Sequence, residues 1–303
     1  IGCVMPVNFH KVHYFNEIFG GMLDVLEAEE YALLTSYHNI PELPPLKRMI
    51  PTAVTKGEVD GLILVRTRVD YGPLIDSLQQ SPHFGNRPIV TLMHVVPPYP
   101  AVITDDRLGA YQAAKHLLDL GHRHIMQLLM QQEDPVMASR LAGIAQAMTE
   151  RGLDPNQHLH CFLTEAGWGT PYTLTDDLGD DENSRVISGE IGQRLLNYLQ
   201  DHRNITAIIG TNDVSAIRVW HILQHRGWRI PDDMSIIGFD DTDPKVNIDG
   251  YNSLTTVRLP LADAGRTAAR LIVDQVRGNT APKEPIILPT ELVIRSSTAP
   301  ANR

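Results

Sequence analysis

The sequence lacks the features that would place it outside ordinary globular proteins. It has only two cysteines, Cys3 and Cys161, which form no C-x-x-C pair and no disulfide framework, as is typical of a reducing cytosol. No apolar run approaches the roughly 18 to 20 residues that cross a bilayer. The opening residues, IGCVMPVNFH, contain no basic segment before an apolar run, so no secretory signal is expected. We therefore predict a cytoplasmic protein with no membrane partner.

Motifs for cofactor binding and catalysis are also missing. No G-x-G-x-x-G follows the first apolar run, and the chain contains no G-x-x-x-x-G-K-[ST], H-E-x-x-H or G-x-S-x-G. An enzyme could use the adjacent Asp240 and Asp241 as an acid and base pair, but no nucleophile or metal supports that alternative. We predict that the protein is not an enzyme and carries no cofactor.

Histidine is plentiful, with 13 residues, and two short stretches invite a metal interpretation: HLHC at 158–161 and GHRH at 121–124. A structural zinc site needs a second ligand pair at a suitable spacing, and the sequence shows none. The acidic stretch near 176–182 lacks the residue order of a calcium loop. Surface or turn histidines, with no metal site, are the expectation.

Positive charge is sparse. The formal net charge is −10, and the 26 Lys and Arg residues form no dense stripe. Because neutralisation of phosphates supplies most non-specific affinity for nucleic acid, the chain by itself is not expected to bind DNA well.

What the sequence does contain is a regular alternation of short apolar runs and helix-like stretches. A chain of 303 residues is long enough for roughly two domains. Successive β-α-β units predict parallel sheets with helices on both faces, and the pattern restarts after residue 104. The predicted strands are 1–7, 31–37, 60–65, 88–94, 101–104, 124–130, 205–210 and 234–237, and the predicted helices are 14–30, 42–56, 74–80, 105–120, 139–151, 188–201 and 213–226.

One segment, at 167–185, interrupts this rhythm with Gly, Thr and Asp and no apolar period. A solvated loop is the simplest interpretation. A loop of this length is uncommon within a compact domain, and such loops are often lids or binding loops. We predict a lid that orders when a ligand binds.

Polar residues follow many of the predicted strands. The stretch MSIIGFDDTDP at 234–244 ends an apolar strand in two acids, where an open α/β sheet binds its ligands. A turn is the alternative, since Asp and Pro cluster where chains reverse. Helix capping is the alternative role for Asp105, and either Asn212 or Asp213 is expected to cap the helix that follows. Because polar residues recur at the strand ends of both halves, we expect them to form two facing rims of one cleft. These residues are Asn8, His94, Thr104, Asp105, Asn212, Asp213, Asp240 and Asp241.

Longer stretches carry a family resemblance. TAIIGTNDVSAIRVWHILQHRGWRIPDDMSIIGFDDTDP, LTTVRLPLADAGRTAARLIV and ELVIRSST resemble the effector-binding core of the lactose-repressor (LacI/GalR) family of bacterial transcription regulators. RLAG at 140–143, HLLDLGHRHI at 116–125 and VDGLIL at 59–64 fit the same pattern. The resemblance runs from residue 1 nearly to residue 303.

This resemblance implies an α/β periplasmic-binding-protein type I fold, in which two doubly wound parallel-sheet subdomains are joined by three crossover strands. The implied N-subdomain comprises 1–104 and 258–290, and the C-subdomain 105–257 and 291–303. A helix-turn-helix headpiece upstream of residue 1, through which operator DNA would be bound, is also implied. Closure of the two lobes around an effector would control the binding of operator DNA. The same closure would occur with an inducer or with a co-repressor.

The family's effector contacts transfer to individual positions. Asp240 and Arg140 match residues that hold effector hydroxyls or polar ring atoms, and Asn212 matches the Asn of the family's ND pair. Trp168 falls where an aromatic covers the ligand, and Tyr14 and Phe15 match aromatics of the N-lobe, although both could be core. His94 stands where many members carry Asp. The implied contacts are Tyr14, Phe15, His94, Arg140, Trp168, Asn212 and Asp240.

The resemblance therefore implies the effector-sensing domain of a transcription regulator for a sugar or sugar derivative. The alternative is a periplasmic sugar-binding receptor of a transport system. A homodimer is predicted through one face of the helix that follows residue 212, where residues at i, i+3, i+4 and i+7 align. These residues are Ile217, Trp220, His221 and Gln224; Trp220 could instead pack into its own core.

Overall fold

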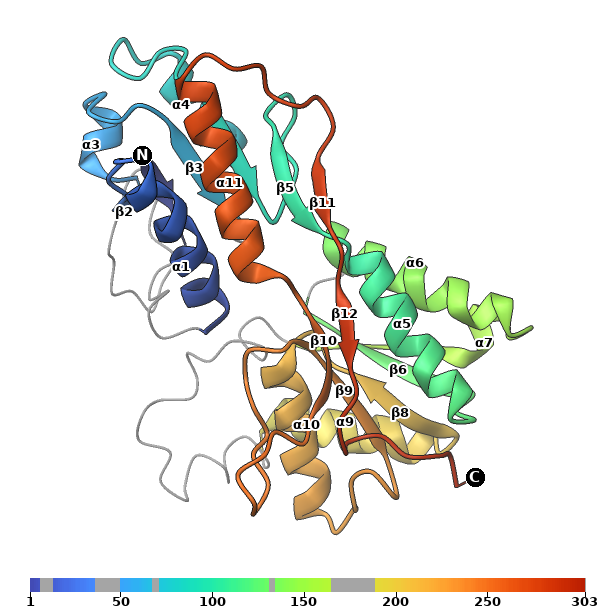
Figure 1. Ribbon diagram of the computed structural model, residues 1–303. Helices are drawn as coiled ribbons and strands as arrows, with labels where there is room; N and C mark the ends of the chain where they lie inside the picture. Colours follow the sequence, from blue (N-terminus) through green and yellow to red (C-terminus); the bar gives the residue numbers. More distant parts are fainter. Residues whose placement is uncertain (6–12, 36–49, 67–70, 131–133, 165–188, 303) are drawn as a thin grey trace. The chain divides into compact units, whose positions relative to one another are not determined.

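A computed structural model describes residues 1–5, 13–35, 50–66, 71–130, 134–164 and 189–302 (Figure 1). The chain divides into two compact units. Unit 1 comprises Ile1–Thr104 and Pro260–Leu288, and unit 2 comprises Asp105–Leu259 and Pro289–Arg303. The chain passes from one unit to the other at 104/105, 259/260 and 288/289. The last two positions lie within two residues of the boundaries expected at 257/258 and 290/291. The predicted class, two doubly wound α/β units, is confirmed.

Unit 1 is built on a six-stranded sheet in the order β11-β5-β4-β3-β1-β2, and every pair in it is parallel. Its central strands are buried throughout, as expected for a sheet covered on both faces. The strands are β1 (Gly2–Val4), β2 (Leu34–Thr35), β3 (Leu62–Val65), β4 (Ile89–Leu92), β5 (Ala101–Thr104) and β11 (Ile286–Leu288).

In the part of unit 1 that the structure describes, the helices are α1 (His13–Ala28), α3 (Thr52–Thr55), α4 (Gly72–Gln79) and α11 (Leu261–Val276). Helices α1 and α11 lie side by side (Figure 1). Leu62, Leu64 and Phe84 belong to the core on the α3 and α4 side.

Unit 2 has a second six-stranded sheet, in the order β12-β10-β9-β8-β6-β7. Only β12 runs antiparallel to its neighbour β10. The strands are β6 (His124–Leu129), β7 (Leu159–Leu163), β8 (Ile205–Ile209), β9 (Ser235–Asp240), β10 (Thr255–Arg258) and β12 (Glu291–Val293). The helices are α5 (Asp106–Asp119), α6 (Pro135–Glu150), α7 (Pro155–His158), α9 (Glu190–Asp201) and α10 (Asp213–His225).

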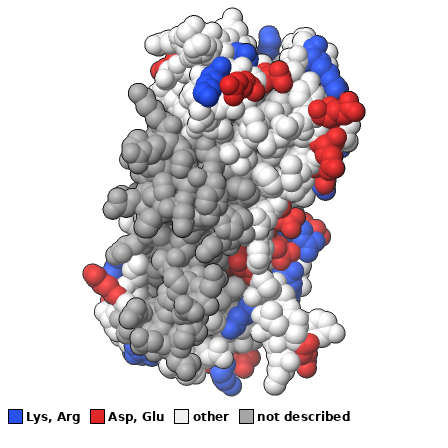
Figure 2. All heavy atoms as spheres, turned by 90° about the vertical axis from the view of Figure 1, so that its left-hand side faces the viewer, with Lys and Arg blue, Asp and Glu red and all other residues white. Residues whose placement is uncertain are grey.

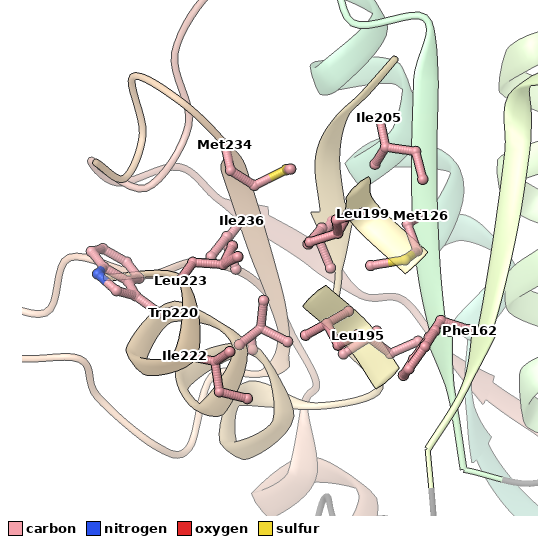
Figure 3. Packing of buried hydrophobic residues seen from close by; sticks show 14 of the residues in the cluster. Met126, Phe162, Leu195, Leu199, Ile205, Trp220, Ile222, Leu223, Met234 and Ile236 are labelled. Carbon is pink, nitrogen blue, oxygen red and sulfur yellow. The ribbon is translucent and has the colours of Figure 1, made fainter. Parts of the chain in front are cut away.

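Apolar side chains from β6, β7, β8, β9, α9 and α10 form the main core of unit 2 (Figure 3). Met126, Leu195 and Ile236 are essentially inaccessible to solvent within it. Trp220 belongs to the same cluster but lies at its margin (Figure 3). This core fixes α10 against β8 and β9, so the strand ends of unit 2 are held on a rigid support.

Most predicted elements exist, with shifted bounds. Within the described residues, the strands expected at 1–7 and 31–37 are present as β1 and β2, and the end of the helix expected at 42–56 is present as α3. The predicted helix ends at Gly121, Gly152 and Gly227 are correct, and each glycine has a left-handed φ. Strand β7 was not predicted, because His160 and Cys161 interrupt its apolar pattern. None of the described helices combines the length and hydrophobicity needed to span a bilayer.

Candidate functional site

The carboxyl ends of β8 and β9 lie next to each other in unit 2, because these strands are parallel and Ile209 pairs with Ile237. Beyond β8 the chain runs through Thr211 to Asn212, and β9 ends at Asp240. The predicted meeting of polar residues at this edge of the sheet is therefore present within unit 2. Each of the two strands delivers its polar groups to the same edge, where open α/β sheets bind ligands.

The backbone at the end of β9 is unusual. Asp240 has a φ of 105° and Asp241 a φ of 61°, both in the left-handed region that non-glycine residues rarely adopt. Such conformations cost of order 1 to 3 kcal/mol each and cluster at ligand sites. The Asp240 carboxylate makes no hydrogen bond within the part of the chain that the structure describes, and its side chain is half-buried. The Asp240 carboxylate is thus a hydrogen-bond acceptor that is held in position and can accept hydrogen bonds from a ligand.

Arg140, on α6, places a positively charged side chain at this edge of the sheet. Its guanidinium lies over the Phe239 ring, 3.4 Å from the centroid, which suits a cation–π contact. Its Nε donates to Asp106 Oδ1 at 2.7 Å, and its Nη1 donates to the Thr211 carbonyl oxygen at 2.6 Å. The side chain is only 5% exposed. Its direct carboxylate partner is therefore Asp106, which the sequence analysis did not name.

A close helix contact brings this pair together. A Cβ atom added to Gly143, the last residue of RLAG, would come 2.2 Å from the Arg107 carbonyl oxygen. Only glycine therefore lets α6 approach α5 so closely. Asp106 is in the first turn of α5, where the positive end of the helix dipole favours a carboxylate. The spacing of Arg140 and Gly143 in RLAG is explained by this packing.

Asp240 lies in an electrostatic field of mixed sign. Burial raises its pKa well above the usual range, and the positive charge of Arg140 opposes that shift. The carboxylates of Asp213 and Asp106 act in the same direction as burial. The positive charge of Arg140 thus faces the negative charges of several carboxylates. A ligand that donates hydrogen bonds to Asp240 would therefore stabilise this edge of the sheet.

Asp213, the first residue of α10, is fully buried. Its Oδ2 accepts from the backbone N–H of Thr242 at 2.9 Å and of Asp243 at 3.3 Å, and its Oδ1 accepts from the Thr256 hydroxyl. Burial raises its pKa to about 7, although these three hydrogen bonds lower it. A Cβ atom at Gly238 would lie 2.2 Å from Asp213 Oδ1, so the glycine of GFDD leaves room for this carboxylate.

Two capping predictions have different outcomes. Asp105 caps α5 as predicted, since its Oδ1 accepts from Leu108 N at 2.9 Å. Helix α10 is capped by Asn212, whose Oδ1 accepts from Ser215 N at 3.0 Å within a capping box. The capping interpretation of Asp213 is wrong, because the buried bonds to the loop after β9 compete for its carboxylate. Asn212 lies at the edge as expected, with its amide oxygen used as the cap.

Asp241 joins the loop after β9 to two neighbouring segments of unit 2. Its carboxylate forms ion pairs with Arg258 Nη2 and Arg295 Nη2, each at 2.8 Å, and it is largely buried. Arg295 also donates to the Leu254 carbonyl oxygen at 2.7 Å. Asp241 therefore ties the end of β9 to β10 and to the residues after β12.

Three predicted contacts belong to unit 1. Tyr14 and Phe15 are half-buried near the start of α1, with their rings edge-to-face at 5.0 Å. His94 follows β4, and its Nδ1 lies 3.1 Å from the Leu92 carbonyl oxygen. Its Nε2 is buried and has no hydrogen-bond partner within the described chain. Burial, the largest cause, and then the charge of Arg66 lower the pKa of His94, which favours the neutral imidazole.

Trp168 and the predicted lid at 167–185 lie outside the described residues. Their assignment as an aromatic cover and a ligand-ordered lid stays a prediction.

The predicted dimer face on α10 is only partly accessible in one chain. Trp220 is 9% exposed and packs in the unit 2 core, whereas Gln224 is exposed and Ile217 is half-buried. His221 Nε2 lies 2.7 Å from Lys245 Nζ. Burial first, and then the Lys245 charge, lowers the pKa of His221 to about 4.

Charge on the surface is mixed. On the face shown in Figure 2, the described Lys and Arg side chains are interspersed with Asp and Glu and form no continuous basic area.

Comparison with known proteins places this site in a family. The model of the periplasmic binding protein-like domain matches residues 114–298. The HTH-type transcriptional regulator DegA of Bacillus subtilis is 34% identical over 205 residues, covering 68% of this chain and 54% of DegA. The HTH-type transcriptional repressor CytR of Escherichia coli is 27% identical over 292 residues, covering 94% of this chain and 75% of CytR. This chain thus spans about half of the length of DegA.

A solved structure shows the same fold over both units. The LacI family transcriptional regulator from Enterococcus faecium, with bound ribose, superposes with a TM-score of 0.74 at 24% identity and covers 99% of each chain. The fold, the family match and the relatives agree with the resemblance carried by the GFDD and RLAG stretches. The chain belongs to the periplasmic binding protein-like family.

Proposed function

We propose that this chain is the effector-sensing part of a cytoplasmic DNA-binding transcription regulator, and that its effector is a sugar or a sugar derivative. Operator DNA would be bound by a helix-turn-helix segment outside this chain, as the names of DegA and CytR suggest. The observation that carries the proposal is the Asp240 carboxylate. It is half-buried in a strained backbone beside Arg140 and has no hydrogen bond within the described chain.

The chemistry of this edge suits a polyhydroxylated ring. A carboxylate accepts hydrogen bonds from hydroxyl groups, and a guanidinium donates to hydroxyl or ring oxygens. Hydrogen bonds to charged groups are stronger than those between neutral groups. The ribose named for the Enterococcus faecium regulator belongs to the same chemical class.

Calorimetric titration of the chain with a panel of sugars tests this function. The panel should contain D-ribose, other pentoses, hexoses and a disaccharide, with amino acids as the non-carbohydrate controls. We expect saturable binding of at least one sugar and recovery of that sugar unchanged. If only non-carbohydrates bind, or if the bound sugar is consumed, the proposal is wrong.

Asp240 and Asp241 should have separable roles, although they are neighbours. Asp240→Asn keeps the size of the side chain but removes the charged acceptor, so sugar affinity should fall about tenfold or more. Asp241→Asn removes the ion pairs with Arg258 and Arg295, so unit 2 should lose about 1 to 2 kcal/mol of stability. Titration with the bound sugar and urea denaturation measure the two effects.

Each of these two variants is the control for the other. Equal losses of affinity, or a loss of affinity at Asp241→Asn alone, would contradict the assignment.

We also propose a homodimer that uses the outer face of α10 together with the adjoining segment 245–252. That segment is closed by a bridge between Val246 and Asn252, and Lys245 joins it to His221 on α10. It exposes three apolar side chains: Val246, Ile248 and Tyr251. Ile248 is fully exposed and Tyr251 is 72% exposed, which favours coverage by a second copy of the chain.

Ile248→Asp and Tyr251→Asp should shift the sedimentation of the protein from dimer towards monomer, because each would bury a charge in the interface. These positions test the interface better than Trp220, whose replacement would also disrupt the core of unit 2. Val95→Asp is a matched control, since Val95 is an exposed apolar residue of unit 1. A monomeric wild type, or an unchanged dimer for both variants, would refute this interface.

A further inference from the structure

A group of imidazoles lies at the amino ends of β6 and β7, on the opposite edge of the unit 2 sheet from Asp240. The parallel register pairs Met126 with His160, so His124 and His160 face the same side of the sheet. His158 precedes β7, and His202 follows α9. The two stretches GHRH and HLHC, which share no ligand spacing in the sequence, are therefore brought together by strand pairing.

The geometry of one pair is specific. His124 Nδ1 and His160 Nε2 are 3.3 Å apart. Two ligands of a tetrahedral zinc ion, with Zn–N bonds of about 2.0 to 2.1 Å, are separated by about 3.3 Å. An N–H···N hydrogen bond of this length would be a long one. The two nitrogens thus have the spacing of two ligands that share one metal ion.

Neighbouring groups would support such an ion. The His158 ring centroid is 4.5 Å from that of His124, and its Nδ1 is buried with no hydrogen-bond partner in the described chain. Tyr198 Oη lies 3.5 Å from His160 Nδ1, on the side away from His124, where a ligating imidazole directs its second N–H. Asn204 Nδ2 lies 3.0 Å from His124 Nδ1 and would be displaced by the ion.

The pair is also accessible to an ion from solvent. Both side chains are half-buried rather than sealed, which leaves access for an ion. Cys161 adjoins His160 in an extended strand and points to the other face, so its thiol is not part of the pair.

We propose that His124 and His160 form a two-histidine chelate for a borderline divalent cation such as Zn²⁺. Among the described residues, no group of three or more His, Cys, Asp or Glu side chains is placed to hold a metal ion, so the proposed protein ligands are these two alone. Water, or His158 after a rotation of its ring, would complete the coordination. The ion would join the edge strand β7 to β6, away from the sugar-binding edge.

Titration of the 303-residue chain with zinc chloride tests this site, in chelator-free buffer at pH 7.5 and without a histidine tag. We expect one equivalent to bind, with at least a tenfold loss of affinity in His124→Gln and in His160→Gln. His225→Gln is the matched control, because His225 is an exposed histidine of the same unit, and its affinity should not change. Tryptophan emission should confirm that each variant is folded.

Two further readouts separate this chelate from loose surface binding. Zinc should raise the melting temperature of the wild type and of His225→Gln but not of the two chelate variants, since a ligand stabilises the state that binds it. Affinity should fall as the pH is lowered, because protons compete for the imidazoles. Absence of saturable binding, or binding that is unchanged in both His124→Gln and His160→Gln, overturns the proposal.

Discussion

Arg140→Ala should lower the free energy of unfolding of unit 2 by about 3 to 5 kcal/mol and abolish sugar binding. The substitution leaves the Asp106 carboxylate buried without its cation, and removal of one member of a buried ion pair costs about this much. It also removes the group that lies over Phe239 and bonds the Thr211 carbonyl oxygen. Arg140 and Asp106 are both more deeply buried than Arg258 and Arg295, the arginines that pair with Asp241.

Tryptophan fluorescence during urea denaturation measures this effect, because all three tryptophans lie within the residues of unit 2. Arg151→Ala is the control. Arg151 also pairs with a carboxylate, that of Asp119, but on the surface, so its loss should cost less than about 1 kcal/mol.

A double variant separates stability from binding. Asp106→Leu together with Arg140→Met replaces the pair with apolar side chains of similar size and should recover much of the stability. Sugar binding should stay lost, because no guanidinium remains. A single Arg140→Ala variant that is as stable as the wild type, or a double variant that binds sugar normally, would contradict the role assigned to Arg140.

The sequence predicts the fold well where apolar runs are long and uninterrupted. The strands of LILV at 62–65 and SIIGFD at 235–240 are continuous in the sequence and buried in the structure. Strand β7 could not be predicted in this way, because its pattern, LHCFL, lies at the edge of the sheet and contains two polar side chains.

For the site, the sequence identifies the residues better than it identifies their partners. The GFDD and RLAG stretches identify Asp240 and Arg140, and both residues lie in unit 2. The pairing of Arg140 with Asp106 spans 34 residues and depends on the helix contact at Gly143, which no local pattern encodes. Asp213 illustrates the same limit. An acid at the start of a helix suggests a cap, and only the tertiary structure shows that it is buried under the loop after β9.

The histidines show how strand register creates a site. In the sequence, His124 and His160 are 36 residues apart, so neither lies at a recognised spacing from the other. Their proximity follows from the parallel pairing of β6 with β7, which a strand missed in the sequence cannot provide. The prediction that no metal is bound rested on this missing spacing, and the zinc titration tests it.

Asp213→Asn should remove a pH dependence of stability that the wild type has between about pH 4 and pH 7. Burial is the main reason that the pKa of Asp213 is raised from 3.8 to about 7 in the folded protein. A carboxyl whose folded pKa is raised stabilises the fold fully below its unfolded pKa, and this contribution is lost as the pH rises through the folded value. Each unit of pKa shift corresponds to 1.36 kcal/mol, so the loss reaches up to about 4 kcal/mol.

Asparagine is a suitable replacement because it resembles the protonated acid. Its oxygen can still accept from the backbone N–H of Thr242 or Asp243, and its amide can donate to the Thr256 hydroxyl, which both donates and accepts. The variant should therefore keep the loop after β9 in place while it stays neutral at every pH. Asp213→Ala removes the acceptor and should be destabilised at every pH, because the two N–H groups and the hydroxyl lose their partner.

The difference in unfolding free energy between wild type and Asp213→Asn, followed by tryptophan fluorescence from pH 4 to pH 8, is the quantity to measure. The buried histidines, such as His122 and His221, have lowered pKa values and titrate in the opposite sense, but they are common to both proteins and cancel. Relative to the variant, the wild type should become steadily less stable as the pH rises, and the difference should level off above pH 7. A difference that is flat across this range would show that Asp213 is ionised in the folded protein, where its charge is stabilised by the three hydrogen bonds that it accepts.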